Sequence, residues 1–269
     1  MASREATARS QSLERGLAVL SAFRSGRPLL GISELGREVG LSRSTTHRYV
    51  ATLATLGYLQ QDAVTRKYRL GPRVLDLGFS AIHSMELREI SAPHLQQLSD
   101  ETGYTVNMAV LDGADIVYIE RCRSAGIGQR AIDLNLHVGS RLPAYCTSMG
   151  KILLAYLPQD KRDELLGQME LRQRGPNTLT ARRALVAELD QVRERGLAIN
   201  NEELAYGLRS IAAPVLSQSG TVSAAINLAV HSSLVSLDQL VERLGAPLRR
   251  TAADISARIG YRAPAPNGT

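Results

Sequence analysis

The chain has 269 residues, a hydrophobic content of 44% and a net charge of +6. This length allows a small domain and a second domain with a sizeable core. No apolar run approaches the roughly 20 residues needed to cross a bilayer, and residues 1–5 lack the apolar stretch of a signal peptide. Two cysteines, Cys122 and Cys146, have no partner at metal-ligand spacing and favour a reducing compartment. We therefore expect a cytoplasmic protein without membrane partner, metal or cofactor.

The positive charge is concentrated at the N-terminus. Residues 1–75 hold 12 Lys and Arg against 5 Asp and Glu, a net of +7, whereas the remainder holds 20 against 21, a net of −1. A phosphate-binding surface concentrates cations in this way. The first quarter of the chain is therefore the candidate nucleic-acid-binding region.

Residues 32–56 indicate two short helices around a tight turn. Ser33 is placed to cap the first helix and Ser42 the second, with Gly40 in the turn. In its first two turns, the second helix carries cations and small hydroxyls on the face opposite its apolar side. Such groups suit phosphate oxygens and base edges in a major groove. A helical hairpin with a solvated polar face is the alternative. The buried stripe of the second helix is expected at Thr46, Tyr49 or Val50, Leu53 and Leu56.

A polar turn at residues 62–66 separates two alternating segments, 58–61 and 67–70, which predicts the winged form of the motif. Upstream, a supporting helix that closes the small core is expected from the spacing of Leu13, Leu17, Leu20 and Phe23. The partner implied is double-stranded DNA. The candidate DNA-binding residues are Ser33, Ser42, Arg43, Ser44, Thr45, Thr46, His47 and Arg48 in the helices and Arg66 and Lys67 at the wing tip.

Composition and periodicity predict how the whole chain is divided into domains. We divide it into a disordered tail at 1–9, a winged helix-turn-helix domain at 10–72, a linker helix at 73–91, a second domain at 92–262 and a disordered tail at 263–269. The linker is partly apolar, so it is expected to pack on the second domain or on its counterpart in a dimer. Pro93 is expected to open a further helix that Gly103 stops.

The second domain is predicted to have an α+β fold with a mixed antiparallel sheet. Residues 104–111 and 115–122 flank Asp112-Gly113-Ala114 and predict a hairpin. Further strands are expected at 131–136, 197–200, 210–216 and 222–230, and helices at 148–157, from Thr180 to Gly196, and at about 237–259.

Six segments, taken together in their order and spacing, resemble the isocitrate-lyase-regulator (IclR) family over nearly the whole chain. They are QSLERGL at 11–17, STTHR at 44–48, TVNMAVL at 105–111, LPA at 142–144, MGK at 149–151 and EELAYGLR at 202–209. Residues 139–151 further resemble the branch that regulates aromatic-acid catabolism through the β-ketoadipate pathway. The resemblance implies a winged helix, a linker helix and a GAF-like effector domain, assembled as dimers or tetramers.

A carboxylate-binding site is expected where Thr147 or Ser148 caps a helix, because the first backbone N–H groups there lack internal partners. We expect Gly150 to keep one flank of this site open. By resemblance, the backbone of Ser148 and Met149 holds the effector, and Asn200 and Ala229 stand where the family has an acid and a hydroxyl. The candidate effector-binding residues are Arg141, Leu142, Tyr145, Thr147, Ser148, Met149, Asn200, Ser210, Asn227 and Ala229.

Other interpretations of these residues stay open. Arg141 and Arg209 can supply a cation for a second carboxylate, or be solvated or paired with an acid such as Glu202. Ser148 can merely cap a structural helix, and Cys146 is expected to be a packing residue rather than a redox sensor.

An enzyme is the alternative function. Ser148 and Lys151 have the spacing of a serine acyl-transferase nucleophile and its lysine. The chain contains no Ser-Asp-Asn or Lys-Thr-Gly to complete that site, and His137 with Cys146 lacks an orienting third residue. A purely architectural DNA binder is disfavoured by the polar second domain. We therefore expect a bacterial, nucleoid-associated transcription regulator that binds a palindromic operator and is controlled by a small carboxylate, an aromatic acid or its ring-cleavage product.

Overall fold

The computed structural model describes residues 10–23, 26–77, 86–123 and 136–262. Contacts divide the chain into two units, Met1–Ser84 and Met85–Thr269. Both predicted tails and residues 131–135 of a predicted strand lie outside the described residues, as do residues 78–85 of the predicted linker. Among the described residues, no helix combines the length and the apolar character that crossing a bilayer requires.

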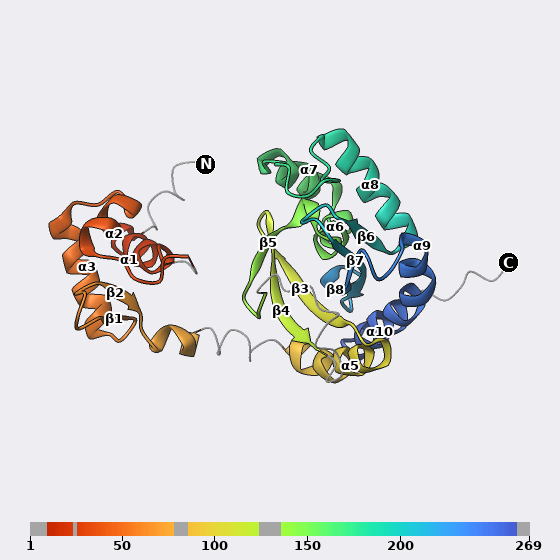
Figure 1. Ribbon diagram of the computed structural model, residues 1–269, viewed down its shortest axis with the longest axis horizontal. Coiled ribbons are helices and arrows are strands. Elements are labelled where there is room, and N and C mark those ends of the chain that lie inside the picture. The colour runs from red at the N-terminus through yellow and green to blue at the C-terminus, as the bar shows by residue number, and fades with distance from the viewer. Residues whose placement is uncertain (1–9, 24–25, 78–85, 124–135, 263–269) are drawn as a thin grey trace. The chain divides into compact units, whose positions relative to one another are not determined.

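The first unit has the predicted helices and hairpin, in the predicted order (Figure 1). The elements are α1 (Gln11–Ser21), α2 (Ile32–Val39), α3 (Arg43–Thr55), β1 (Leu59–Gln61) and β2 (Tyr68–Leu70). Gly40 has φ 67°, a left-handed conformation that ends α2 and makes the turn. Ser42 caps α3 by accepting a hydrogen bond from the backbone N–H of Thr45. These two local signals set the helix-turn-helix geometry, as predicted.

Three expectations about capping and packing in this unit were wrong. Gly31, not Ser33, is the N-cap of α2, and the Glu34 carboxylate accepts the Gly31 N–H at 2.7 Å. Leu13 and Leu17 are 63% and 54% exposed, whereas the other two predicted residues, Leu20 and Phe23, pack against the core together with the fully buried Val19. The last residue predicted for the buried stripe of α3, Leu56, is 46% exposed.

The second unit is built on a six-stranded sheet in the order β5-β4-β3-β8-β7-β6, in which all the neighbouring pairs are antiparallel. The predicted hairpin is confirmed as β3 (Thr105–Asp112) and β4 (Asp115–Cys122). The later strands are confirmed as β6 (Ala198–Asn201), β7 (Leu208–Leu216) and β8 (Val222–His231), and β5 (Arg141–Pro143) is a short strand that was not predicted.

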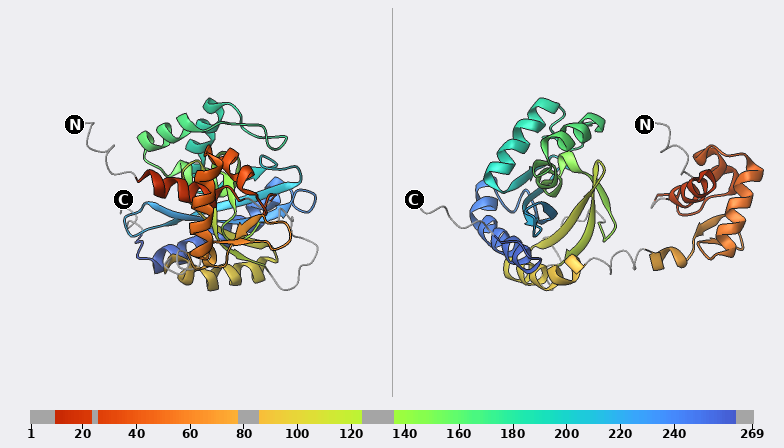
Figure 2. Two further views of the ribbon diagram at one scale, coloured as in Figure 1. Left: turned by 90° about the vertical axis from the view of Figure 1, so that its left-hand side faces the viewer. Right: turned by 180° about the vertical axis from the view of Figure 1, so that it is seen from behind.

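Helices cover both faces of this sheet (Figures 1 and 2). On one face lie α5 (Glu86–Thr102) and α10 (Gly245–Arg258), over a core that includes Val106, Met108 and Ile226. On the other lies α6 (Ser148–Ala155), against which α8 (Arg182–Arg195) packs. Because side chains alternate along a strand, the neighbours of the core residues in β3 and β8 point toward α6.

The remaining helices differ in part from the sequence prediction. The helix predicted to open at Pro93 begins at Glu86, with Pro93 inside α5, so the predicted boundary at residue 91 falls within one helix. The final helix is interrupted: α9 (Leu237–Gln239) and a π-helical segment (Leu240–Leu244) precede α10. Helix α7 (Gln159–Gln168) and the 3₁₀ turn at Ala144–Cys146 were not predicted.

Candidate functional site

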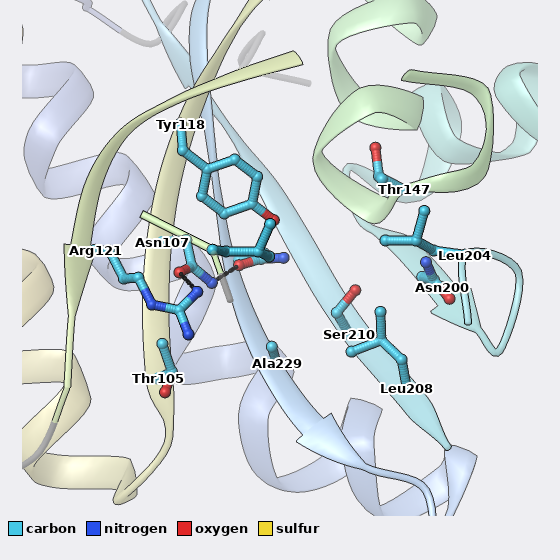
Figure 3. Close-up of a pocket in the computed structure, with 12 residues that line it drawn as sticks. Thr105, Asn107, Tyr118, Arg121, Thr147, Asn200, Leu204, Leu208, Ser210 and Ala229 are labelled. Atoms are coloured by element: carbon cyan, nitrogen blue, oxygen red, sulfur yellow. Dashed lines mark hydrogen bonds between the residues drawn. The ribbon is translucent and has the colours of Figure 1, made fainter. Parts of the chain in front are cut away.

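A polar cavity lies between the sheet and the start of α6 in the second unit, and two rows of residues across neighbouring strands form its floor (Figure 3). In the first row, Asn107 of β3 lies opposite Arg121 of β4 and Asn227 of β8. The second row joins Thr105, Ala229, Ser210 and Asn200, from β3, β8, β7 and β6. The floor therefore brings together residues from five strands that are far apart in sequence.

Hydrogen bonds connect the first row to α6. Arg121 Nη1 donates to Asn107 Oδ1 at 3.2 Å, and Asn107 Nδ2 donates to Asn227 Oδ1 at 2.8 Å. Asn227 Nδ2 donates to Ser148 Oγ at 3.4 Å, and the hydroxyls of Ser148 and Ser210 lie 2.7 Å apart. Both asparagines and both serines are at most 5% exposed. We call these five residues the polar chain.

Tyr118 projects into the cavity from β4 (Figure 3). A bulge shifts the register between β3 and β4, so that Ala109 pairs with Tyr118 while Met108 pairs with Glu120. The extra residue places Tyr118 and Arg121 on the same face despite their odd spacing. Burial raises the pKa of Tyr118 to about 12, so its hydroxyl stays protonated at neutral pH. No hydrogen bond joins this hydroxyl to another described residue.

The cavity is narrow, and one of its described lining residues is charged. Its empty volume is about 460 Å³ including the open mouth, but a water-sized sphere can move in only about 30 Å³ of it. That is room for about one water molecule. Of the twelve described residues that line it, Arg121 alone is charged, and Leu136, Leu204 and Leu208 form an apolar side. The space therefore suits a small molecule with an anionic group and an apolar body, provided that side chains move to admit it.

Five of the predicted effector-binding residues line this cavity: Thr147, Asn200, Ser210, Asn227 and Ala229. Ser148 reaches it through the polar chain. Asn200 has both amide atoms engaged, because its Nδ2 donates to Cys146 O and its Oδ1 accepts the Glu203 N–H. Thr147 is the cap of α6 and accepts the Gly150 N–H. Asn200 and Thr147 thus hold the cavity wall in place.

The other predicted effector residues lie elsewhere. Arg141 is at the hairpin end, where its guanidinium bonds Asp112 at 2.7 Å and Asp115 at 3.4 Å. Tyr145 donates to the Arg172 carbonyl and lines a separate depression. Met149 and Leu142 belong to the apolar core around α6. These side chains do not line the cavity, and the contact expected from the backbone of Met149 stays a prediction.

Gly150 does not open a flank of the site as expected. A Cβ at this position would overlap the carbonyl oxygen and Cα of Ala144, so glycine allows close packing of α6 on the preceding turn. Arg209 donates to Asn201, Ser232 and Val235 rather than facing the cavity. Cys146 is fully buried, and burial raises its pKa to about 12, so it is an unreactive packing residue at neutral pH.

Lys151 is paired with acids rather than with Ser148. It is 1% exposed, and its Nζ lies 2.6 Å from Glu203 and 3.4 Å from Glu188. The Ser148 hydroxyl is bonded to Ser210 and Asn227 instead. The lysine therefore does not serve as a base for the serine, and the acyl-transferase alternative has no geometric support. Among the described residues, no three His, Cys, Asp or Glu side chains cluster as metal ligands would.

Arg121, Asn107, Tyr118 and Thr105 line the cavity but were not predicted as site residues. The sequence does carry one signal for them: Thr105 and Asn107 are polar residues two apart in an otherwise apolar strand. Period two places them on one face, and polar residues on a buried face point to a cavity or a hydrogen-bond partner.

In the first unit, Ser42, Arg43, Ser44, His47 and Arg48 are exposed at the N-terminal half of α3, and Thr45 is half-buried. Thr46 is fully buried, and its hydroxyl donates to the Ser42 carbonyl. The expectation that Thr46 contacts DNA was therefore wrong, and its place in the buried stripe is confirmed. Ser33 is exposed within α2.

The two cations predicted at the wing tip, Arg66 and Lys67, differ in their surroundings. Arg66 is exposed and has φ 57°, a left-handed backbone that side chains other than Gly and Asn adopt at a cost. Asp62 holds this turn by accepting hydrogen bonds from the N–H and hydroxyl of Thr65. Lys67 lies 3.1 Å from Glu34, so it ties the wing to α2.

A winged helix-turn-helix unit joined to a second unit with a polar cavity defines a class of protein, the ligand-responsive transcription regulators. The comparisons agree with this class. The model of the IclR helix-turn-helix domain matches residues 12–63, and that of the bacterial transcriptional regulator IclR C-terminal domain matches residues 79–257. The chain belongs to the IclR family of bacterial transcriptional regulators.

Individual relatives extend over nearly the whole chain. The Pca regulon regulatory protein of Pseudomonas putida is 40% identical over 92% of this chain and 84% of its own length. The p-hydroxybenzoate hydroxylase transcriptional activator of Acinetobacter baylyi is 32% identical, over 90% and 89%. The crystal structure of an IclR homolog from Microbacterium hydrocarbonoxydans in complex with 4-hydroxybenzoate has a TM-score of 0.78 and 28% identity, over 93% and 99%.

Proposed function

We propose that this chain regulates genes of aromatic-compound catabolism and that a small organic acid, an aromatic acid or its ring-cleavage product, controls its binding to DNA. The observation that carries this proposal is the cavity, which joins one cation and a buried polar floor to an apolar side. A carboxylate satisfies such donors, and a flat ring suits the apolar side. The relative crystallised with 4-hydroxybenzoate supports the same ligand class.

Ligand entry has to change the shape of the second unit. An aromatic acid is much larger than the roughly one water that fits in the closed cavity, so the apolar side formed by Leu136, Leu204 and Leu208 must open. The acid then stabilises the open conformation by its differential affinity for it. We propose that this shift alters how the subunits of a homo-oligomer present their winged helices to an operator in the bacterial cytoplasm.

Assembly as a dimer or a dimer of dimers fits the small size of the DNA-binding unit, because one winged helix contacts too little DNA for tight specific binding. Paired copies would bind a palindromic operator. Exposed apolar residues offer surface for association: Leu13 and Leu17 on one face of α1, and Leu75 and Leu77, which are 61% and 57% exposed.

Thermal unfolding tests whether an organic acid binds. The melting temperature is measured in the presence of 4-hydroxybenzoate, 3,4-dihydroxybenzoate or β-ketoadipate, with benzyl alcohol as the neutral control. At a concentration 100 times its Kd, a cognate acid should stabilise the protein by about 2.7 kcal/mol. Asn227→Leu should lose this response but keep DNA binding, since residue 227 lies in the other unit. A panel in which no acid raises the melting temperature, or an unchanged response in Asn227→Leu, would contradict the proposed ligand site.

The substitution Arg66→Gly tests whether the wing contacts DNA. Glycine relieves the left-handed backbone at this position, so the first unit should become more stable by about 1 kcal/mol. Loss of a phosphate or groove contact should nevertheless weaken binding to duplexes selected from a random library and reduce the salt dependence of binding by about one ion. Ala63→Gly, in the same exposed turn, is the control and should bind like the parent. If Arg66→Gly binds as tightly as the parent at every salt concentration, the wing does not touch DNA.

A further inference from the structure

Tyr118 is a buried tyrosine whose hydroxyl the fold does not use. The residue is 4% exposed, its ring packs in the apolar core around α6, and its hydroxyl points into the cavity (Figure 3). No described residue forms a hydrogen bond with this hydroxyl. A buried polar group without a partner costs folding free energy, and phenylalanine has the same ring without that cost. The packing of the second unit therefore explains the ring of Tyr118 but not its oxygen.

Tyr145 shows how a structural tyrosine of the same core is bonded. It is also 4% exposed and belongs to the same apolar core. Its hydroxyl donates to the Arg172 carbonyl at 2.7 Å and accepts the Arg172 N–H at 3.1 Å. The hydroxyl of Tyr145 thus fixes a neighbouring segment of the chain. The two tyrosines are equally buried and differ in what their hydroxyls bind.

Most other polar groups of the cavity have partners within the protein. The asparagines and serines of the polar chain bind one another, and Asn200 binds two backbone groups. The Thr105 hydroxyl has no partner among the described residues either, but it points away from Tyr118, at the opposite end of the floor (Figure 3). Tyr118 therefore presents to the cavity a hydroxyl that no described residue occupies.

A break in the regular pattern of the sheet brings Tyr118 to the cavity face. The register of β3 and β4 shifts, and Ile119 is passed over between the paired residues Glu120 and Tyr118. Regular alternation counted from Arg121 would put Ile119 on the cavity face. Ile119 packs instead in the core on the side of α5 and α10, and Tyr118 faces the cavity. Bulges often redirect a side chain in this way next to a functional site.

We infer that the Tyr118 hydroxyl donates a hydrogen bond to a carboxylate oxygen of the effector, which makes Tyr118 a specificity-determining residue. This inference rests on the proposed function and deepens it. A donor held on a strand of the sheet has to meet an oxygen that every effector of the proposed class carries, and these acids all share the carboxylate. Burial raises the pKa of Tyr118 to about 12, so the hydroxyl keeps its proton at neutral pH. A hydrogen bond from it to an anion is charge-assisted and stronger than one to a neutral oxygen.

Tyr118→Phe tests this inference, because it removes one oxygen and keeps the ring. The full chain is titrated calorimetrically with 4-hydroxybenzoate, 3,4-dihydroxybenzoate, β-ketoadipate and benzoate, which share a carboxylate but not a ring hydroxyl. Every acid that the parent binds should bind about 10- to 100-fold more weakly to Tyr118→Phe. Tyr145→Phe, at equal burial but outside the cavity, is the matched control and should bind these acids like the parent.

The melting temperature without ligand separates a binding role from a structural one. Tyr118→Phe loses no hydrogen bond to a described residue, so it should melt at or above the temperature of the parent. Tyr145→Phe should melt about 2–4 °C lower, because the Arg172 carbonyl loses its donor. A lower melting temperature for Tyr118→Phe would show that its hydroxyl stabilises the fold, and the inference would be wrong.

The inference and the proposed function fail in different ways. If Tyr118→Phe binds the acids as tightly as the parent, Tyr118 does not contact the effector, although the proposed function stands. If only the acids with a ring hydroxyl bind more weakly, Tyr118 recognises that hydroxyl, and its assignment to the carboxylate is wrong. If the parent itself binds none of the four acids, the proposed function is wrong.

Discussion

Replacing Lys151 with Met should destabilise the second unit by about 3–5 kcal/mol, the range found when one partner of a buried ion pair is removed. Glu203 would keep its charge at 6% exposure, without the ammonium that lies 2.6 Å away in the parent. One of its oxygens, Oε2, is already buried without a hydrogen-bond partner among the described residues. Urea denaturation followed by circular dichroism measures the loss.

The loss should depend on pH with a definite sign. Burial raises the pKa of Glu203, and Lys151 opposes this rise, so removing the lysine should raise the pKa of Glu203 further. An acid whose pKa is higher in the folded than in the unfolded state favours folding at low pH, and that advantage is lost as the pH rises through the folded-state pKa. The difference in stability between Lys151→Met and the parent should therefore be smaller at pH 5 than at pH 8.

A double variant provides the control. In Lys151→Met/Glu203→Met both charges are gone, and replacing a buried pair by apolar side chains is often neutral or stabilising. Glu188 keeps a partner there, because Arg195 lies 3.0 Å from it. The double variant should therefore recover most of the stability. If it is as unstable as the single variant, the shape of Lys151, rather than its charge, is what matters.

Gly150→Ala should cost at least about 3 kcal/mol, despite the higher helix propensity of alanine. The added Cβ would overlap the Ala144 backbone and crowd the Thr147 hydroxyl, so α6 must move away from the turn at Ala144–Cys146. Overpacking of this kind typically costs 1–3 kcal/mol when only side chains give way, and here the obstacle is backbone. Because Ser148 begins α6 and belongs to the polar chain, effector binding should be lost as well. Thermal unfolding and ligand titration measure the two effects.

Gly167→Ala in α7 is the matched control for this change. The nearest atom to a Cβ at position 167 is the end of the Arg182 side chain, at 4.0 Å, so nothing obstructs it. Alanine should stabilise this helix by up to about 1 kcal/mol and leave ligand binding unchanged. Equal melting temperatures for Gly150→Ala and the parent would mean that α6 can move freely on the preceding turn.

Local signals explain why the DNA-binding unit could be predicted from the sequence. The cap Ser42, the left-handed turn at Gly40 and the apolar spacing around Val50 act within a few residues of chain. The hairpin from β3 to β4 is equally local, since a two-residue turn joins its strands. Where the prediction failed in this unit, as at Leu13 and Leu17, periodicity identified the helix but not the amount of core available to cover it.

The cavity could be predicted only in part. Thr147 and Ser148 were found from the helix-cap pattern and the residues on β6, β7 and β8 through the family resemblance, but Arg121, Asn107 and Tyr118 were not found. The bond between Asn107 and Asn227 spans 120 positions of sequence, and no local pattern specifies that pairing. Tyr118 faces the cavity because a bulge shifts the register of β4. Simple alternation counted from Arg121 would place Tyr118 on the other face of the sheet.

The sequence by itself thus determined the two-unit architecture, the helix-turn-helix and its wing, because helix caps, turns and periodic apolar residues act over short distances. Only the tertiary structure decided which arginine enters the cavity. Arg121, Arg141 and Arg209 carry the same side chain, and no local pattern in the sequence distinguishes them. Arg141 is held by two aspartates and Arg209 by two carbonyls and an asparagine, whereas Arg121 meets Asn107 on the cavity face. The difference lies in strand order and register, which long-range pairing sets.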